Sequence, residues 1–337
     1  MTRAALGVER TTRASRIGLG GAIVLLTGLA ALPWTHGAGA MRMIVELIAL
    51  LVLAQMWNLL AGYAGLVSIG QQAYVGLGGY ALIVLADDLG VNPFLAVPLA
   101  GLIAAAFALP TAALVFRFRA GYFAVGTWAV AEVYRLLVAN STALGRGTGR
   151  TLKAVFPIAR ETRELATYAI ALAIGVGAIV AVYLYLRSRR GLGLQAVRDS
   201  EPASESLGVD VFRNKLAAYL IAAFGTGTTG ALIYLNLLRI SPDAAFSINW
   251  TASIIFIVVI GGLGTLEGPI IGTIVFFALR EMLADYGAWY MILFGALAVV
   301  LMMRFPQGLW GLLAARWDVR FFPVQRRVRL DAPVTGE

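Results

Sequence analysis

The chain has 337 residues, of which 60% are hydrophobic and 13% are charged, and its mean hydropathy is +0.81. Soluble domains are about 45–50% apolar and about 25% charged, so a single water-surrounded core is excluded and a lipid bilayer is the expected solvent. The net charge of +9 comes from basic residues beside apolar runs, which the positive-inside rule explains better than nucleic-acid binding does.

Ten apolar runs are long enough, or nearly long enough, to cross a bilayer, which takes about 20 residues. They are hydrophobic all round, as lipid-embedded helices are, and they lack the strict alternation of an outer-membrane barrel. We therefore predict an all-α polytopic integral membrane protein with about ten transmembrane or half-membrane helices. The short run at 251–263 leaves open whether 251–284 crosses fully or forms a re-entrant pair. In chain order the runs are 17–34, 41–60, 66–86, 93–116, 121–139, 167–186, 215–238, 251–263, 267–284 and 288–304.

Clusters of Lys and Arg predict the orientation, because positively charged loops stay in the cytoplasm. Basic groups precede the first run and follow the fourth, the sixth and the last, and alternating crossings place all four on one face. We expect a multi-pass protein of the bacterial plasma (inner) membrane with cytoplasmic N- and C-termini. Residues 1–16 are predicted as a basic cytoplasmic N-terminus, 17–311 as the transmembrane domain and 312–337 as a basic cytoplasmic tail.

The loop at 140–166 disagrees with this orientation, because it is predicted to lie outside yet carries several cations. Within it GRGTGRT (145–151) resembles a phosphate-binding loop but lacks the lysine and spacing of that motif, so a flexible external loop is predicted. The first run also imitates a cleavable signal peptide; an uncleaved span is favoured, and cleavage is left open. The cations of the loop are Arg146, Arg150, Lys153, Arg160 and Arg163.

Two glycine-rich passages interrupt the apolar runs, AGYAGLVSIGQQAYVGLGGY at 61–80 and IGGLGTLEGPIIG at 260–272. In the second, glycines recur every four residues from Gly264, a ridge that lets helices approach closely, and Pro269 favours a broken helix. Broken helices at corresponding places in two halves often line a substrate path, although tight packing alone explains the glycines equally well. The candidates for a translocation path are Gly65, Ser68, Gly70, Gln71, Gln72, Gly262, Gly264, Glu267 and Gly268.

The segment at 196–215 is densely charged in an otherwise apolar chain. Burying such charges would cost about 2.5–3.5 kcal/mol each on insertion scales, so the segment must lie outside the bilayer, on the cytoplasmic side. It reads as a short helix over 198–208: Ser200 or Glu201 caps the start, Pro202 suits the first turn, and Gly208 suits the end. A helix of two turns is marginal alone, so it needs a surface on which to dock.

Five blocks, in this order, resemble the permease family of branched-chain amino acid ABC importers, specifically the LivM-type subunit. The resemblance covers most of 60–311, with two departures: Pro202 stands where the wider importer motif has Glu, and Gln71 stands where His is expected. The blocks are GYAGLVSIGQQAYVGLGGY (62–80), GLGLQAVRDSEPASESLGVDVFRNKLAAYLIAAFGTGTTGAL (191–232), SPDAAFS (241–247), VVIGGLGTLEGPIIG (258–272) and RFPQGLWG (304–311).

The resemblance implies that 187–214 is a cytoplasmic coupling loop whose helix docks into a groove of an ATPase subunit. It also implies that substrate passes from an extracytoplasmic binding protein through a channel shared with a homologous second permease subunit, driven by two ATPase subunits. ATP and magnesium would bind those ATPases, and this chain would bind no cofactor. The implied coupling residues are Arg198, Asp199, Glu201, Pro202, Ala203, Ser204, Glu205, Leu207 and Gly208.

Other functions are less well supported by the residues. The chain has no nucleotide-binding fingerprint, and without cysteine it has no disulfide, thiolate metal site or cysteine nucleophile, so neither an enzyme nor a metal site is predicted. A self-sufficient secondary transporter would need ionisable groups near mid-membrane, for which Glu132 and Glu46 are the candidates. Glu132 is three residues from Arg135 and is expected to pair with it. Within the importer family, a permease for urea, short amides or simple sugars is the alternative, and the sequence identifies neither substrate nor partner chains.

Overall fold

The computed structural model describes residues 6–9, 13–35, 37–119, 121–283, 289–304, 307–317, 321–322 and 327–330. These residues are mostly helical, which confirms the predicted all-α class. The longer helices are α1 (Arg13–Thr35), α2 (Ala38–Asn58), α4 (Pro93–Val115), α5 (Gly121–Asn140), α6 (Arg160–Arg187) and α9 (Val211–Leu237). The shorter ones are α3 (Gln72–Ile83), α7 (Arg189–Asp199), α8 (Glu201–Ser206), α10 (Pro242–Ala245), α11 (Ile248–Gly261), α12 (Glu267–Met282), α13 (Trp289–Arg304) and α14 (Gly308–Trp317).

Two π-helical turns and four short strands complete the described elements. The turn η1 (Leu59–Tyr63) continues α2, and η2 (Val84–Asp88) continues α3. Strand β1 (Leu6–Glu9) pairs antiparallel with β4 (Arg327–Leu330), so segments near the two chain ends lie side by side. Strand β2 (Arg150–Thr151) pairs antiparallel with β3 (Arg239–Ile240).

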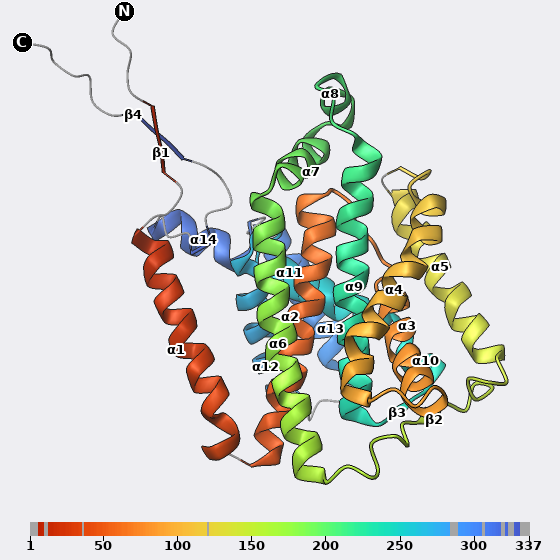
Figure 1. Cartoon of the computed structure of the whole chain (residues 1–337). Coiled ribbons are helices and arrows are strands. Elements are labelled where there is room, and N and C mark those ends of the chain that lie inside the picture. Colours follow the sequence, from red (N-terminus) through yellow and green to blue (C-terminus); the bar gives the residue numbers. More distant parts are fainter. Residues whose placement is uncertain are drawn as a thin grey trace, which may run out of the picture.

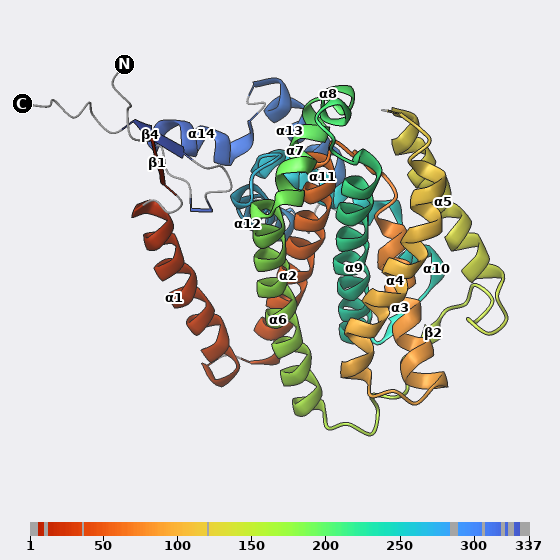
Figure 2. The same cartoon turned by 45° about the horizontal axis from the view of Figure 1, so that its top comes forward.

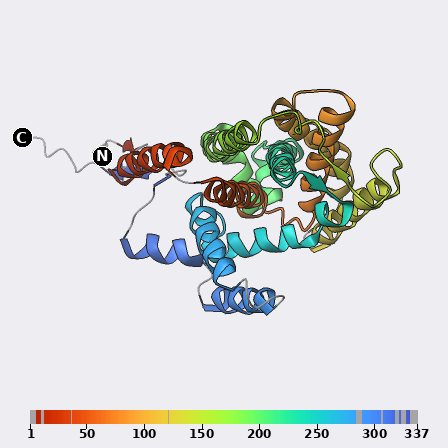
Figure 3. The same ribbon diagram turned by 90° about the horizontal axis from the view of Figure 1, so that it is seen from below.

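The long helices run between two ends of the molecule (Figure 1). We call these the α8 end and the β2 end, after an element found at each. The α8 end carries α7 and α8 and the start of α1, and the β2 end carries β2, β3 and the loop before α6; Figure 2 keeps this arrangement. Seen from the β2 end, the cyan and blue C-terminal helices form a layer along one side of the other helices, and α1 stands apart (Figure 3).

By length and composition, six helical stretches of the described residues can cross a membrane, so the predicted count of about ten is not confirmed. At 14 and 16 residues, α11 and α12 are about 21 and 24 Å long, shorter than the ~30 Å hydrocarbon core. Of the predicted termini, 1–16 and 312–337, the structure describes 6–9, 13–16, 312–317, 321–322 and 327–330; α1 begins at Arg13 and α14 ends at Trp317. The six stretches are Ala38–Tyr63, Pro93–Val115, Gly121–Asn140, Arg160–Arg187, Val211–Leu237 and Pro242–Gly261.

The apolar run at 66–86 is not the single helix that its composition suggests. Residues 64–71 have no regular helix, and the helical part begins only at Gln72. Here the backbone bonds to side chains: Ile69 N donates to Thr127 Oγ1 at 3.1 Å, and Gly70 N donates to Ser68 Oγ at 3.2 Å. Irregular backbone at membrane depth is tolerated where it is enclosed by protein, as it is at this point.

Helix α9 is the centre of the fold and packs against α2, α3, α4 and α6. Asp210 caps its start by accepting a hydrogen bond from Arg213 N at 2.9 Å, and Leu238 ends it in a left-handed conformation with φ of 64°. Glycines let neighbours approach it: a Cβ on Gly78 of α3 would lie 1.9 Å from the Gly227 carbonyl oxygen. Close helix contacts through small residues are typical of membrane bundles.

Candidate functional site

The charged segment folds as two helices, where one helix over 198–208 was predicted. Arg198 and Asp199 end α7, and Ser200 interrupts the helix with an extended backbone. The Ser200 side chain then caps α8 by accepting a hydrogen bond from Ala203 N at 3.4 Å, with Pro202 in the first turn as predicted. Gly208 follows the end of α8 with φ of 80°, the conformation expected of a terminating glycine.

Helix α8 exposes apolar side chains that nothing else in the described chain covers. Leu207 is 82% exposed, and Pro202 and Ala203 are also exposed. Ser204 points the other way: it is buried, and its hydroxyl donates to the Ser200 carbonyl at 2.8 Å. A prominent exposed leucine outside the membrane helices is typical of a docking surface, and the Ser204 side chain cannot be part of it.

One ion pair holds α8 against the start of α9. Lys215 Nζ lies 2.5 Å from Glu201 Oε1, and the lysine side chain is only 15% exposed. Arg213 pairs with Asp210 at 3.2 Å, whereas Glu205 has no ion pair among those described. The charges of the segment are therefore partly structural, since Glu201 anchors α8 to the central helix.

Arg198 joins the charged segment to the first glycine passage. Its Nη1 donates to the Gly62 carbonyl in η1 at 2.7 Å, across 136 residues of sequence. Its side chain also lies over Gly65, which has φ of 70° and where a Cβ would come within 3.3 Å of Arg198 Cγ. The guanidinium continues to Asp199, 3.0 Å away. A side chain at position 65 would therefore be both strained and crowded.

The second glycine passage meets the first at the same point. A Cβ on Gly62 would lie 2.6 Å from Gly264 N, and one on Gly264 would lie 3.6 Å from Arg198 Nη1. Asn58 binds the second passage through both atoms of its side-chain amide. Its Oδ1 accepts from Gly264 N at 2.9 Å, and its Nδ2 donates to the Thr265 carbonyl at 2.8 Å. We call this meeting of Arg198, Gly62 and Gly264 the glycine junction.

Two residues of the site were missed by the sequence analysis. Asn58 is fully buried in the junction, and Gln55, one turn earlier on α2, donates to the Leu266 carbonyl at 2.7 Å. The signal was present, because two amides three residues apart in an apolar run need hydrogen-bond partners on one helix face. What the sequence lacked was any indication that the partners lie more than 200 residues away.

The turn between α11 and α12 is tightly closed, which confirms the predicted break near Pro269. Gly262 has φ of 130°, and a Cβ on Gly268 would lie 2.2 Å from its carbonyl oxygen. Thr265 bridges the turn, donating to the Gly262 carbonyl and accepting from Gly268 N at 2.9 and 3.0 Å. The nearly buried Glu267 accepts a hydrogen bond from Phe322 N at 2.9 Å. Of the four candidates of this passage, Gly262, Glu267 and Gly268 are buried, and Gly264 is partly buried.

Gly70, Gln71 and Gln72 contact helices that take no part in the junction, whereas Ser68 contacts α2, the helix of Asn58. The Ser68 carbonyl accepts from the Trp57 indole at 2.7 Å, and a Cβ on Gly70 would lie 2.2 Å from the Thr127 carbonyl oxygen. Gln71 Oε1 accepts from Thr226 of α9 at 3.1 Å, while its Nε2 is buried without a partner among the described residues. Gln72 bonds to Thr251 of α11 through both its backbone N–H and its side-chain oxygen. The structure therefore divides the predicted path residues into two groups.

The comparisons with known proteins show the family of the chain. The chain belongs to the family described as branched-chain amino acid transport system permease component, whose model matches residues 39–303. It is 27% identical over 313 residues to the high-affinity branched-chain amino acid transport system permease protein LivM of Salmonella typhimurium, covering 85% of this chain and 73% of the relative. LivM of Escherichia coli K12 matches with the same identity and coverage. No solved structure matches significantly.

The family and the helices together define a multi-pass membrane transport subunit. The family description, a transport system permease component, is that of a transport subunit and not of a catalytic one. Within the described residues, no group of three or more His, Cys, Asp or Glu side chains is placed to hold a metal ion.

Proposed function

We propose that this chain is a transmembrane permease subunit of an ATP-driven importer of branched-chain amino acids. It works beside a homologous second permease and two ATPase subunits that bind ATP and magnesium, and it receives substrate from an extracytoplasmic binding protein. The substrate class is supported by the family and by the names of the two relatives. The α8 end is the cytoplasmic face of the plasma membrane, as the basic groups indicate.

The observation that carries this proposal is the exposed α8 connected to the glycine junction. Leu207 and Ala203 dock in a groove of an ATPase subunit, so that closing of the ATPases moves α8. The ion pair between Glu201 and Lys215 transmits this movement to α9. The Arg198 side chain transmits it to Gly62 and Gly264. The turn η1 is π-helical, a form frequent at functional sites, and three glycines near the junction, Gly65, Gly262 and Gly264, have positive φ; we expect the backbone to change conformation here during the transport cycle.

The buried amide of Gln71 is the best candidate for a group on the substrate path. A donor buried without a partner costs about 1–3 kcal/mol, which a passing carboxylate or water offsets. The glycines at 65, 70, 262, 264 and 268 then shape the path by permitting close backbone contacts. A role in packing alone is the competing explanation, and their substitution distinguishes the two only when stability is measured beside uptake.

Ion-coupled secondary transport is disfavoured by the partners of the two candidate carboxylates. Glu132 is bound by Arg135, which also reaches Asp243, and Glu46 pairs with Arg280 at 2.7 Å. A coupling carboxylate must release and rebind an ion during each cycle, and an arginine within 2.6–2.7 Å opposes that exchange. Glu46 instead joins α2 to α12, and Arg135, which binds Glu132 within α5, also joins that helix to Asp243 of α10.

The test of the proposal is co-purification of the ATPases with the permease, together with leucine uptake in membrane vesicles. Leu207→Asp should sever ATPase binding and uptake, because it places a charge in an apolar groove. The matched control is Glu205→Gln, an exposed position without an ion pair, which should be nearly silent. If Leu207→Asp retains both ATPase binding and uptake, α8 is an ordinary solvated loop and the coupling role is wrong.

A further inference from the structure

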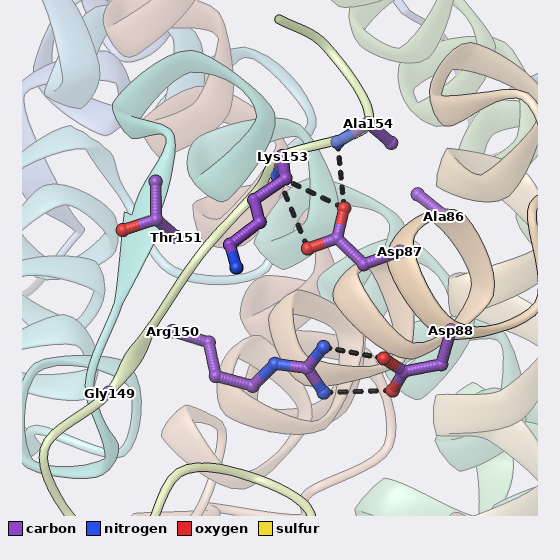
Figure 4. A pocket seen from close by; sticks show the side chains of 8 residues that line it. All are labelled: Ala86, Asp87, Asp88, Gly149, Arg150, Thr151, Lys153 and Ala154. Carbon is purple, nitrogen blue, oxygen red and sulfur yellow. Dashed lines mark hydrogen bonds and ion pairs between the residues drawn. The ribbon is translucent and has the colours of Figure 1, made fainter.

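The β2 end holds a feature that transport through the helices does not explain. A pocket of about 630 Å³ lies between η2 and the loop before α6, lined by Asp87, Asp88, Gly149, Arg150, Thr151 and Lys153 with two alanines (Figure 4). This is the loop whose cations conflict with the positive-inside rule, and it was predicted to be flexible. Arg150 and Arg160 of this loop pair with Asp88 and Glu164, which leaves the other cations of the loop to be explained.

The loop is fixed to the membrane helices at three places. Both carboxylate oxygens of Asp87 accept from Lys153 N, at 3.0 and 3.2 Å, and Oδ1 also accepts from Ala154 N at 2.8 Å. The Arg150 guanidinium donates hydrogen bonds to both carboxylate oxygens of Asp88, at 2.6 and 2.8 Å (Figure 4). Leu152 is fully buried, and its N–H donates to the Leu238 carbonyl at 2.8 Å. The surface is therefore preorganised, which reduces the entropy that a binding partner must overcome.

These contacts occupy the anions of the pocket but leave cations free. Among the described residues, the Lys153 ammonium has no hydrogen-bond or ion-pair partner, and in Figure 4 it points between Thr151 and Arg150. Two further exposed cations without a described ion pair are near: Arg146 on the same loop, and Arg239, which pairs through its backbone with Thr151. Glu161, at the start of α6, is the exposed anion of this end without a described ion pair.

The same surface exposes large apolar side chains. Phe156 is 59% exposed on the loop, and Leu89, directly after η2, is 66% exposed. Exposed aromatic and apolar side chains beside arginine are typical of protein interfaces. A small-molecule site instead needs largely apolar walls that enclose the ligand, and here the walls are charged pairs and backbone.

We infer that Asp87–Asp88, residues 146–156 and Arg239 form a docking surface for an acidic protein, with Lys153 as its central free cation. Given the proposed function, on which this inference rests, the occupant is an acidic surface of the extracytoplasmic binding protein. Lys153 receives a carboxylate of that protein, while Phe156 and Leu89 contact apolar side chains around it. Leu152 bonds to the end of α9, whose other end carries α8, so docking is connected to the coupling segment by one helix of 27 residues.

The test uses the assembled transporter in nanodiscs of phosphatidylcholine, a lipid without net charge, so that anionic lipids cannot compete for the cations. The probe is the binding protein from the same gene cluster, loaded with L-leucine, and its association rate is measured at 50 and 300 mM salt. Lys153→Glu should lower the association rate about fivefold or more and flatten its salt dependence, since exposed interface charges act mainly on the association rate. Phe156→Ala should instead raise the dissociation rate.

Two control variants separate charge from structure. Lys153→Arg keeps the charge and should bind within about twofold of wild type. Arg316→Glu makes the same reversal at an exposed position of α14, away from the β2 end, and should also be within about twofold. If wild type binds and Lys153→Glu binds equally, the docking surface is wrong and the proposed function stands. If wild type neither binds the protein nor takes up leucine, the proposed function fails, and this inference with it.

Discussion

Substituting Gly62 by alanine should disrupt the glycine junction at its centre. The new Cβ would lie 2.6 Å from Gly264 N, 2.8 Å from Gly264 Cα and 2.5 Å from Asn58 Oδ1. Two of these atoms are backbone of the opposite passage, so the clash cannot be relieved by turning a side chain. Overpacking of this kind costs about 1–3 kcal/mol.

The hydrogen bonds around Gly62 add to this cost. Moving the passages apart weakens the bond from Gly264 N to Asn58, about 0.5–1.5 kcal/mol, and the bond from the Arg198 guanidinium to the Gly62 carbonyl. The Arg198 side chain is 40% exposed, so solvent screening lowers its contribution below the ~1.5–3 kcal/mol of a buried charged hydrogen bond, to about 1 kcal/mol. Together the change should destabilise the junction by about 3–5 kcal/mol, beyond what most single substitutions do.

The matched control is Gly177→Ala in α6, where a new Cβ would meet nothing within 4 Å. Purified variants are compared by tryptophan fluorescence during heating, for which Trp57 beside Ser68 is a convenient reporter, and by leucine uptake in vesicles. Gly62→Ala should melt several degrees lower and lose uptake, whereas Gly177→Ala should match wild type. Equal melting and uptake for the two variants would refute the close contact of the passages.

The remaining predictions concern coupling, pH and topology. Arg198→Met should leave ATPase binding intact but lower uptake per ATP hydrolysed about threefold to tenfold, because it removes a bond of about 1 kcal/mol between α7 and η1; unchanged coupling would contradict the role of the junction. The Arg150 guanidinium holds the pKa of Asp88 below its ordinary value. The ion pair therefore stabilises the β2 end fully when the pH is above the ordinary carboxyl pKa. This stabilisation is lost as the pH falls through the lowered pKa of Asp88. Asp88→Asn should therefore reduce the melting temperature at neutral pH and flatten its loss in acid; an acid profile like that of wild type would argue against the pair. A reporter fused after α7 should read cytoplasmic and one within 145–160 external, and the same side for both would overturn the orientation.

Several features followed from the sequence because they depend on local chemistry or on bulk composition. High hydropathy predicted an all-α membrane protein, since a bilayer admits only elements that satisfy their own backbone. Ser200, Pro202 and Gly208 predicted the start, first turn and end of α8, because capping depends on neighbouring residues. The five blocks predicted the family, which the comparison over 39–303 confirms.

Other features required the tertiary structure, because they depend on what lies across the fold. An apolar run such as 66–86 cannot show that residues 64–71 leave the helix, since the Thr127 side chain that satisfies this backbone comes from another helix. The inward turn of Ser204 and the reach of Arg198 to Gly62 were equally invisible in the sequence.

The cations of the 140–166 loop are a second case in which the sequence alone was misleading. By charge alone they contradicted the predicted orientation, and the glycines of GRGTGRT suggested flexibility. The structure binds Arg150 to Asp88 and the backbone at Lys153 to Asp87, which a π-helical turn brings to the loop from more than 60 residues earlier. Composition and local pattern determined the solvent, the helices and the caps. Only the packing of distant segments decided which charges are neutralised within the chain and which remain free to bind a partner.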